Sequence, residues 1–166
     1  PGLVARNIAR HVEAGFPSFY FVDSTFNLPL PYARDLCRKI IESRLRISWR
    51  SILYPGRIDR ELVGLMAEAG CTEVSLGFES GCDRILKGMN KKFEPHDVRL
   101  ASDMLRDAGI RRMGFLLLGG PGETRESVEE SLAFAESLQL DSLKLTAGIR
   151  IYPGTALAKI AREEGV

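Results

Sequence analysis

The sequence predicts an α/β protein built around a parallel sheet. Three short phrases lead to this fold class: "EAGF" at 13–16, "EAGC" at 68–71 and "DAGI" at 107–110. Each follows apolar residues at helical spacing and precedes an apolar run. Glycine just past the last helical turn accepts the left-handed conformation that closes a helix. Each phrase therefore marks a helix that feeds a strand, and such alternation requires parallel strands joined by crossovers.

The individual elements follow from the same patterns. The apolar runs predict strands at 19–22, 47–53, 74–78, 113–118 and 142–147. Helices are expected at 2–14, 31–45, 59–69, 80–87, 95–108, 124–138 and 155–164. Helix starts are indicated by proline at the first position and by capping side chains, namely Pro31, Pro95, Asp59, Ser80, Thr124 and Thr155.

Two architectures fit this order, an open doubly wound sheet and a (β/α) barrel. A complete eightfold barrel needs about 250 residues, and the chain has 166. The chain opens on an expected helix without a preceding strand, and it ends on "EEGV" at 163–166, a helix stop without the next strand. We therefore expect one domain, 1–166, that is a piece of a longer protein.

Composition narrows the class of protein. A formal net charge of +1 and 45% hydrophobic residues describe a globular domain with an apolar core. No Lys/Arg stripe with interleaved aromatics supports nucleic acid as a direct partner. The apolar runs are shorter than a membrane span, and no signal layout opens the chain, so a cytoplasmic protein is expected. The three cysteines lack C-x-x-C spacing, which predicts buried thiols and not a disulfide framework or zinc site.

Polar and glycine-rich residues follow the strands. In either architecture, ligands bind beyond the carboxyl ends of the strands. Helix capping explains about half of these residues, but it does not explain Arg57 or Glu79. We therefore expect a shared site at this edge, assembled from 23–25, 54–57, 79–80, 119–123 and 150–155.

Glu79 is the sharpest single candidate. It closes the apolar strand "VSLGF", where its carboxylate could accept hydrogen bonds from sugar hydroxyls or pair with Arg57 or Arg150. Gly77 in the same strand leaves room for a planar group. The turn at 119–122 is either a tight strand-to-helix connection or a floor for a ligand, because its amides can approach a bound molecule closely.

Four blocks together resemble the radical S-adenosylmethionine (SAM) superfamily. They are "FVDSTF" at 21–26, "EAGCTEVSLGFESGCDRILKGMNKKF" at 68–93, "LLLGGPGET" at 116–124 and "IYPGT" at 151–155. The similarity is closest to the cobalamin-associated and methylthiotransferase-like branches, and it covers nearly the whole chain. It implies a partial (β/α)6 TIM-like barrel in which about five parallel strands, strands two to six, are present.

The resemblance also implies contacts with the methionine and ribose parts of SAM. Asp23 and Ser24 match positions that contact the methionine amino group. Glu79 and Ser80 match fourth-strand positions that handle the ribose. Arg57 resembles a basic residue that follows the family's third strand.

A second set of positions implies contacts with the adenine. Leu117, Gly119 and Gly120 match the fifth-strand stretch that backs this ring. Pro153 and Gly154 match the loop after the sixth strand, near the same ring. A SAM site at the carboxyl edge is therefore expected.

The sequence departs from the family at the iron–sulfur cluster. The family's first strand and its C-x-x-x-C-x-x-C loop, whose thiolates hold a 4Fe–4S cluster, are missing, and Cys71 and Cys82 are not at cluster spacing. In the family, an electron from the cluster cleaves SAM to a 5′-deoxyadenosyl radical, while the protein supplies placement. We expect cluster ligands outside this chain, a parent oxidoreductase with cobalamin as a possible cofactor, and an inert isolated fragment. The substrate remains unknown.

Two alternatives stay open. One is a non-catalytic scaffold descended from this family, which would lack cysteine codons before Pro1. The other is a different (β/α) enzyme that binds phosphate through the amides at 119–122. In either case, the unpaired edge of the strand at 19–22 invites self-association with another copy.

Overall fold

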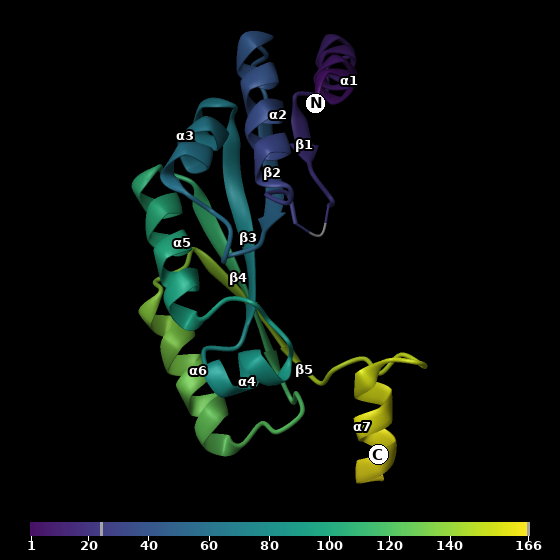
Figure 1. Ribbon diagram of the computed structural model, residues 1–166. Helices are drawn as coiled ribbons and strands as arrows, with labels where there is room; N and C mark the ends of the chain where they lie inside the picture. The colour runs from purple at the N-terminus through teal and green to yellow at the C-terminus, as the bar shows by residue number, and fades with distance from the viewer. Residues whose placement is uncertain (24, 166) are drawn as a thin grey trace.

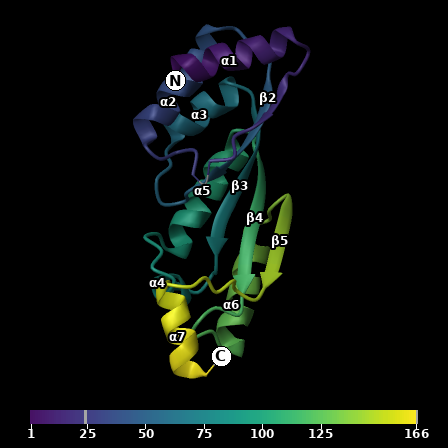
Figure 2. The same ribbon diagram turned by 90° about the vertical axis from the view of Figure 1, so that its right-hand side faces the viewer.

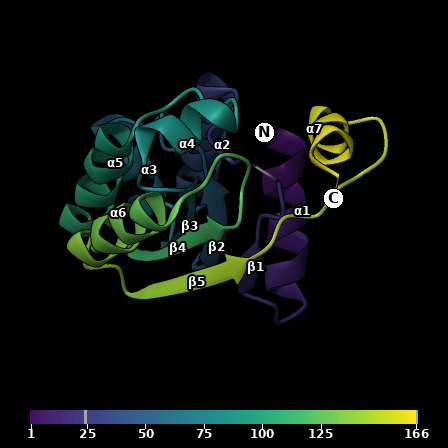
Figure 3. The same ribbon diagram turned by 90° about the horizontal axis from the view of Figure 1, so that it is seen from below.

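The computed structural model describes residues 1–23 and 25–165. They form one five-stranded parallel sheet of order β1-β2-β3-β4-β5, curled into a half-barrel (Figure 3). The strands are β1 (Ser18–Tyr20), β2 (Ser48–Leu53), β3 (Cys71–Glu79), β4 (Arg111–Leu118) and β5 (Ser142–Ala147). The predicted partial barrel with five parallel strands is confirmed.

Helices follow or precede each strand as expected. They are α1 (Gly2–Glu13), α2 (Leu30–Glu42), α3 (Arg60–Glu68), α4 (Asp83–Gly88), α5 (Pro95–Asp107), α6 (Arg125–Ser137) and α7 (Ala156–Glu164). Helices α3, α5 and α6 line one side of the sheet, whereas α7 stands apart from them near the lower ends of the strands (Figures 1 and 2).

Most predicted helix starts are confirmed. The side chains of Asp59, Thr124 and Thr155 cap their helices by accepting a backbone N–H three residues on. Pro95 occupies the first position of α5, but Pro31 is the second residue of α2. The predicted start of a helix at Ser80 is wrong: α4 begins at Asp83, and the hydroxyl of Ser80 bonds elsewhere.

The core lies between the sheet and the covering helices. Strand β3 directs Val74, Leu76 and Phe78 to this side, and all three are fully buried. Facing them, Leu62 of α3 and Leu105 of α5 are also fully buried. Because side chains alternate along a strand, the odd-numbered end of β3 (Gly77, Glu79) faces the uncovered, inner side of the half-barrel.

The sheet ends in two edge strands. Strand β1 pairs only with β2, and β5 only with β4, among the described residues. The predicted position of β1 at an edge is confirmed, while self-association through it stays a prediction. Within 1–23 and 25–165, no helix has the length and apolar character needed to cross a membrane.

Candidate functional site

Parallel pairing gathers the predicted strand ends at one edge of the sheet. Asp23 follows β1, Glu79 ends β3, and Gly119 follows β4 directly. Strand β5 continues through Gly148 and Ile149 into the loop that leads to α7. These predicted residues therefore share the carboxyl edge of the sheet.

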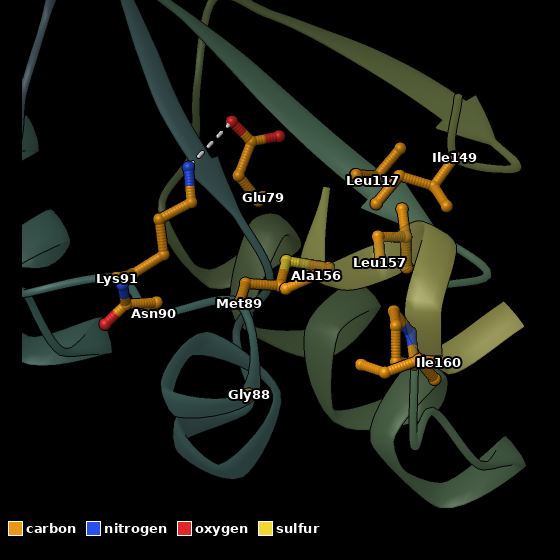
Figure 4. Close-up of a pocket in the computed structure, with 11 residues that line it drawn as sticks. Glu79, Gly88, Met89, Asn90, Lys91, Leu117, Ile149, Ala156, Leu157 and Ile160 are labelled. Atoms are coloured by element: carbon orange, nitrogen blue, oxygen red, sulfur yellow. Dashed lines mark hydrogen bonds and ion pairs between the residues drawn. The ribbon is translucent and has the colours of Figure 1, made fainter. Parts of the chain in front are cut away.

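A cavity of about 410 Å³ opens at this edge, beneath the ends of β3 and β4 (Figure 4). Its volume lies in the range of small-molecule sites. The walls are mostly apolar, with the Glu79 and Lys91 side chains as charged groups. The lining residues are Glu79, Gly88, Met89, Asn90, Lys91, Leu117, Pro121, Ile149, Ala156, Leu157 and Ile160.

Glu79 reaches this cavity through an unusual backbone conformation. Its φ is +65°, in the left-handed region, and the pairing of β3 with β4 slips between Gly77 and Glu79. Such a conformation in a non-glycine residue costs of order 1–3 kcal/mol and clusters at functional sites. The carboxylate pairs with Lys91 at 3.3 Å, and both side chains are partly exposed. One carboxylate oxygen thus has a cationic partner, and the other has no hydrogen-bond partner among the described residues (Figure 4).

The glycine turn after β4 has its backbone amides occupied. The carboxylate of Glu123 accepts hydrogen bonds from the N–H groups of Gly119 and Gly120. A phosphate at these amides would face a carboxylate that already holds them. The turn is therefore a preformed wall, which argues against the phosphate-binding alternative. Sequence analysis missed this role of Glu123, although a carboxylate four residues after Gly119 was a usable signal.

Gly120 lies against one wall of the cavity. A Cβ at this position would come within 2.6 Å of the methyl carbon of Met89, which lines the cavity. Because that methyl is the end of a flexible side chain, a larger residue here would shift Met89 and change the shape of the wall. A neighbouring hollow of about 330 Å³ includes Gly119 and Gly120, and it shares Pro121, Ile149, Leu157 and Ile160 with the main cavity.

The residues predicted to contact adenine fall into two groups in the structure. Leu117 lines the main cavity, and Gly119 and Gly120 line the adjoining one. Pro153 and Gly154 lie outside both sets and form the exposed turn before α7. Helix α7, which follows this turn, lines the cavity instead through Ala156, Leu157 and Ile160. These three residues were not predicted from the sequence, although the apolar face of the helix was a usable signal.

Two of the polar positions do not join the cavity. The hydroxyl of Ser80 is fully buried, lies 2.8 Å from the Ser131 hydroxyl of α6, and accepts the N–H of Cys82. This placement weighs against the predicted ribose contact of Ser80. Asp23 is exposed in the loop after β1. The prediction for Ser24 lies outside the described residues.

Arg57 lines a separate cavity of about 790 Å³ between the loop after β2, the start of α2 and the segment before α5. This second cavity shares no lining residue with the first. Its rim is fixed by Asn27, which is fully buried and was not singled out from sequence. The Asn27 amide donates to the carbonyls of Tyr54 and Arg57 and accepts the N–H of Tyr54.

The cysteines of the chain do not fit a cluster. Cys37, Cys71 and Cys82 are buried and free, and burial raises the pKa of Cys37 and of Cys71 to about 12. Thiolates, not thiols, bind iron, so these side chains are poor ligands. Within the described residues, no group of three or more His, Cys, Asp and Glu is placed to hold a metal ion.

Comparison with known proteins identifies the family. A sequence profile of the Radical SAM superfamily matches residues 1–135. The chain belongs to the radical SAM superfamily. An uncharacterized methyltransferase of Pyrococcus horikoshii is 33% identical over 151 residues, covering 91% of this chain and 33% of that protein. The cytidylyl-2-hydroxyethylphosphonate methyltransferase of Streptomyces wedmorensis is 29% identical over 160 residues, which cover 91% of this chain and 30% of that protein.

Solved structures agree with this radical SAM assignment. The methyltransferase TsrM of Kitasatospora setae, with cobalamin and a [4Fe-4S] cluster bound, has a TM-score of 0.90 at 25% identity over 96% of this chain and 33% of that one. The same enzyme with tryptophan and a SAM analogue bound has a TM-score of 0.85 at 26% identity, over 91% of this chain and 31% of that one. The chain thus spans about a third of the length of the proteins it matches.

Proposed function

We propose that the cavity at the carboxyl edge binds SAM through its adenosyl part. The observation that carries this proposal is the strained Glu79, whose left-handed backbone turns a carboxylate into an apolar cavity of nucleoside-compatible size. A carboxylate accepts hydrogen bonds from ribose hydroxyls. Strain of this kind is retained where the position of the side chain matters more than local stability.

The other residues of the cavity suit the remaining parts of an adenosyl group. Leu117, Ile149 and Leu157 supply apolar walls from three separate elements, as a planar purine requires. Gly119 and Gly120 allow close approach to the ring from the adjoining hollow. Asp23, at the same edge, remains the proposed partner of the methionine amine. The predicted contacts of Arg57, Ser80, Pro153 and Gly154 stay predictions that the geometry supports less.

The chemical contribution of this chain is placement. SAM bound beside a reduced 4Fe–4S cluster supplies a reactive carbon radical in this superfamily, and the protein controls where that reactivity is directed. Glu79 would hold the ribose, Lys91 would orient the Glu79 carboxylate, and Leu117 and Ile149 would exclude water from the purine. The cluster would need ligands other than the cysteines of this chain.

For the parent protein, we propose a radical SAM enzyme of the methyltransferase or methylthiotransferase type. The relatives named above are methyltransferases, and a neighbour of the same fold holds cobalamin, which supports cobalamin as a further cofactor. The substrate is unassigned. A non-catalytic scaffold remains the alternative, and the codons before Pro1 separate the two, because a C-x-x-x-C-x-x-C segment there would supply the cluster ligands.

A titration of the ¹⁵N-labelled chain with SAM tests the proposed site. Saturable shifts of the Glu79, Leu117, Gly119 and Gly120 amides are expected, with weak affinity in the absence of a cluster. The matched control is Glu73→Gln, because Glu73 lies on the same strand and the same face at the opposite edge. Shifts that stay unchanged in Glu79→Gln would contradict the proposal.

A further inference from the structure

The second cavity carries two cationic side chains without anionic partners. Arg57 and Lys92 both line it, and neither has a carboxylate within 4 Å among the side chains described, those of residues 1–23 and 25–163. The Lys92 ammonium donates to the Asn90 side-chain oxygen at 2.7 Å. Two cations that line one concave site favour an anionic ligand, because such a ligand replaces water at both charges.

The acidic residue of the same cavity does not neutralise these charges. Asp59 lines the cavity too, but its carboxylate is held by the Arg34 guanidinium and by the N–H of Leu62. Arg34 also lies 3.1 Å from Glu61, and Glu61 pairs with Arg38 at 2.6 Å, so two arginines face two carboxylates. The charge of Asp59 is therefore balanced within its own cluster, and Arg57 and Lys92 dominate the cavity.

The loop that carries Arg57 is held rigidly. Asn27 fixes it at both Tyr54 and Arg57 through three hydrogen bonds to backbone groups. The Tyr54 ring packs edge-on against Phe93 with 5.2 Å between centroids, and a Cβ on Gly56 would stand only 3.0 Å from the Phe93 Cβ. A loop packed this closely presents its charge with little ordering cost when a ligand binds.

One short segment contributes a lysine to each of the two cavities. Lys91 belongs to the first cavity and pairs with Glu79, whereas the adjacent Lys92 belongs to the second. The segment thus distributes its two charges between two sites. A ligand in the second cavity would leave the Glu79 carboxylate and its partner undisturbed.

We propose that the second cavity binds a phosphate or diphosphate group of a ligand other than SAM. Two cations suit a group with more than one negative charge, and the arginine fork matches phosphate oxygens in pairs. The cavity, at about 790 Å³, also has room for a larger body attached to the phosphate, with Leu28, Leu30 and Ile58 as apolar contacts. Arg57 and Lys92 are the recognising side chains.

Inorganic pyrophosphate tests this site in the ¹⁵N-labelled chain at constant ionic strength. Saturable shifts are expected at the amides of Arg57, Ile58, Lys92 and Phe93. Arg57→Gln should weaken binding about tenfold and Lys92→Gln severalfold, whereas Arg57→Lys should be intermediate because it keeps the charge and loses the fork. Lys144→Gln is the matched control, since this exposed lysine also has no carboxylate within 4 Å in the described part of the chain, and it should change binding by less than twofold.

Three results would overturn the assignment. One is the absence of saturable pyrophosphate binding, and a second is equal binding by wild type and Arg57→Gln. The third is displacement of pyrophosphate by SAM or equal binding of acetate, since either would make this a carboxylate site of the cofactor. The Glu79→Gln variant, expected to bind pyrophosphate normally, separates this proposal from the SAM site: loss of SAM binding alone would leave it standing.

Discussion

The two ends of the same parallel strands are built in opposite ways. At the amino edge, Arg50, Glu73 and Arg111 sit side by side in register and pair at 3.6 and 2.6 Å, and the Arg50 guanidinium covers the Tyr20 ring. At the carboxyl edge, by contrast, the strands end in a left-handed glutamate, a glycine turn and cavities. Paired charges line the hollow of about 400 Å³ at the first edge, whereas the second edge carries backbone strain and a carboxylate that faces an apolar cavity.

The difference indicates how the chain tolerates a strained site. Packing beneath the amino half supplies the stability, for example through Trp49, which is 1% exposed and donates to the Ala69 carbonyl at 2.8 Å. This allows local rules to be broken at the carboxyl edge without loss of the fold. Mutations at the amino edge should therefore change mainly the free energy of unfolding, and mutations at the carboxyl edge mainly SAM binding.

The largest expected effect lies at the amino half. Trp49→Ala removes a buried indole that packs against Phe21 and Phe26, and we expect a loss of about 3–5 kcal/mol in the free energy of unfolding. Urea denaturation followed by circular dichroism measures it. A loss below about 1 kcal/mol would show that this end does not carry the stability assigned to it.

Glu79→Gln should weaken SAM binding roughly 10- to 100-fold, because it replaces a charged acceptor of ribose hydroxyls. The free energy of unfolding should change by less than about 1 kcal/mol, since the Glu79–Lys91 pair is partly exposed. Amide-shift titration and urea denaturation give the two values. If Glu79→Gln and Glu73→Gln weakened SAM binding equally, the proposed difference between the two edges would be wrong.

Alkaline pH should destabilise the chain through its buried thiols. Burial raises the pKa of Cys37 and Cys71 to about 12, whereas an unfolded cysteine ionises near pH 8.5. The stabilisation is complete below about pH 8.5 and is lost as pH rises toward 12, by about 2 kcal/mol per thiol at pH 10. Cys37→Ala, compared with wild type at pH 7 and pH 10, should lose less stability between the two. Parallel losses in both proteins would refute the thiol origin.

The strain at Glu79 should be measurable by pairing two substitutions. Glu79→Gly and Glu79→Ala both remove the carboxylate, but only glycine adopts a φ of +65° without strain. Glu79→Gly should therefore be more stable than Glu79→Ala by about 1 kcal/mol. Thermal unfolding of the two variants tests this, and an alanine variant at least as stable as the glycine variant would contradict it.

The smallest expected effect concerns Asp141, at the amino end of the sheet. The hydrogen bond from the Arg112 N–H, at 2.8 Å, lowers the pKa of Asp141, and the Arg112 guanidinium adds to this. The stabilisation is present above about pH 4, the ordinary value for aspartate, and is lost as the pH falls through the lowered one. The free energy of unfolding should fall less at acid pH in Asp141→Asn than in the wild type. The difference should be below about 1 kcal/mol because the side chain is partly exposed. A larger loss of stability at acid pH in Asp141→Asn than in the wild type would contradict this prediction.

Much of the fold followed from local sequence signals. Glycine after each helix, as in "EAGC" at 68–71, located the helix ends, and strand–helix alternation gave the parallel sheet. The start of α4 was missed because Ser80 resembles a helix cap, while its actual partner is Ser131, distant in sequence. Only the fold brings such pairs together.

The candidate site was predictable only in part. Glu79 stood out from the sequence because it closes an apolar strand, and Leu117 was predicted through the family resemblance. Leu157 and Ile160 of α7 and the clamp of Asn27 were not found, because an apolar helix face or a buried asparagine acquires its role through packing. Likewise, no local pattern indicated that Arg57 would line a different cavity from Glu79.

The most direct test of the account is a crystal structure of the chain with SAM or 5′-deoxyadenosine. We predict the ribose on the Glu79 carboxylate and the purine among Leu117, Ile149 and Leu157. A nucleoside found at the amino edge beside Arg50 and Arg111, or in the cavity of Arg57 with Glu79 still bound only to Lys91, would contradict the central claim.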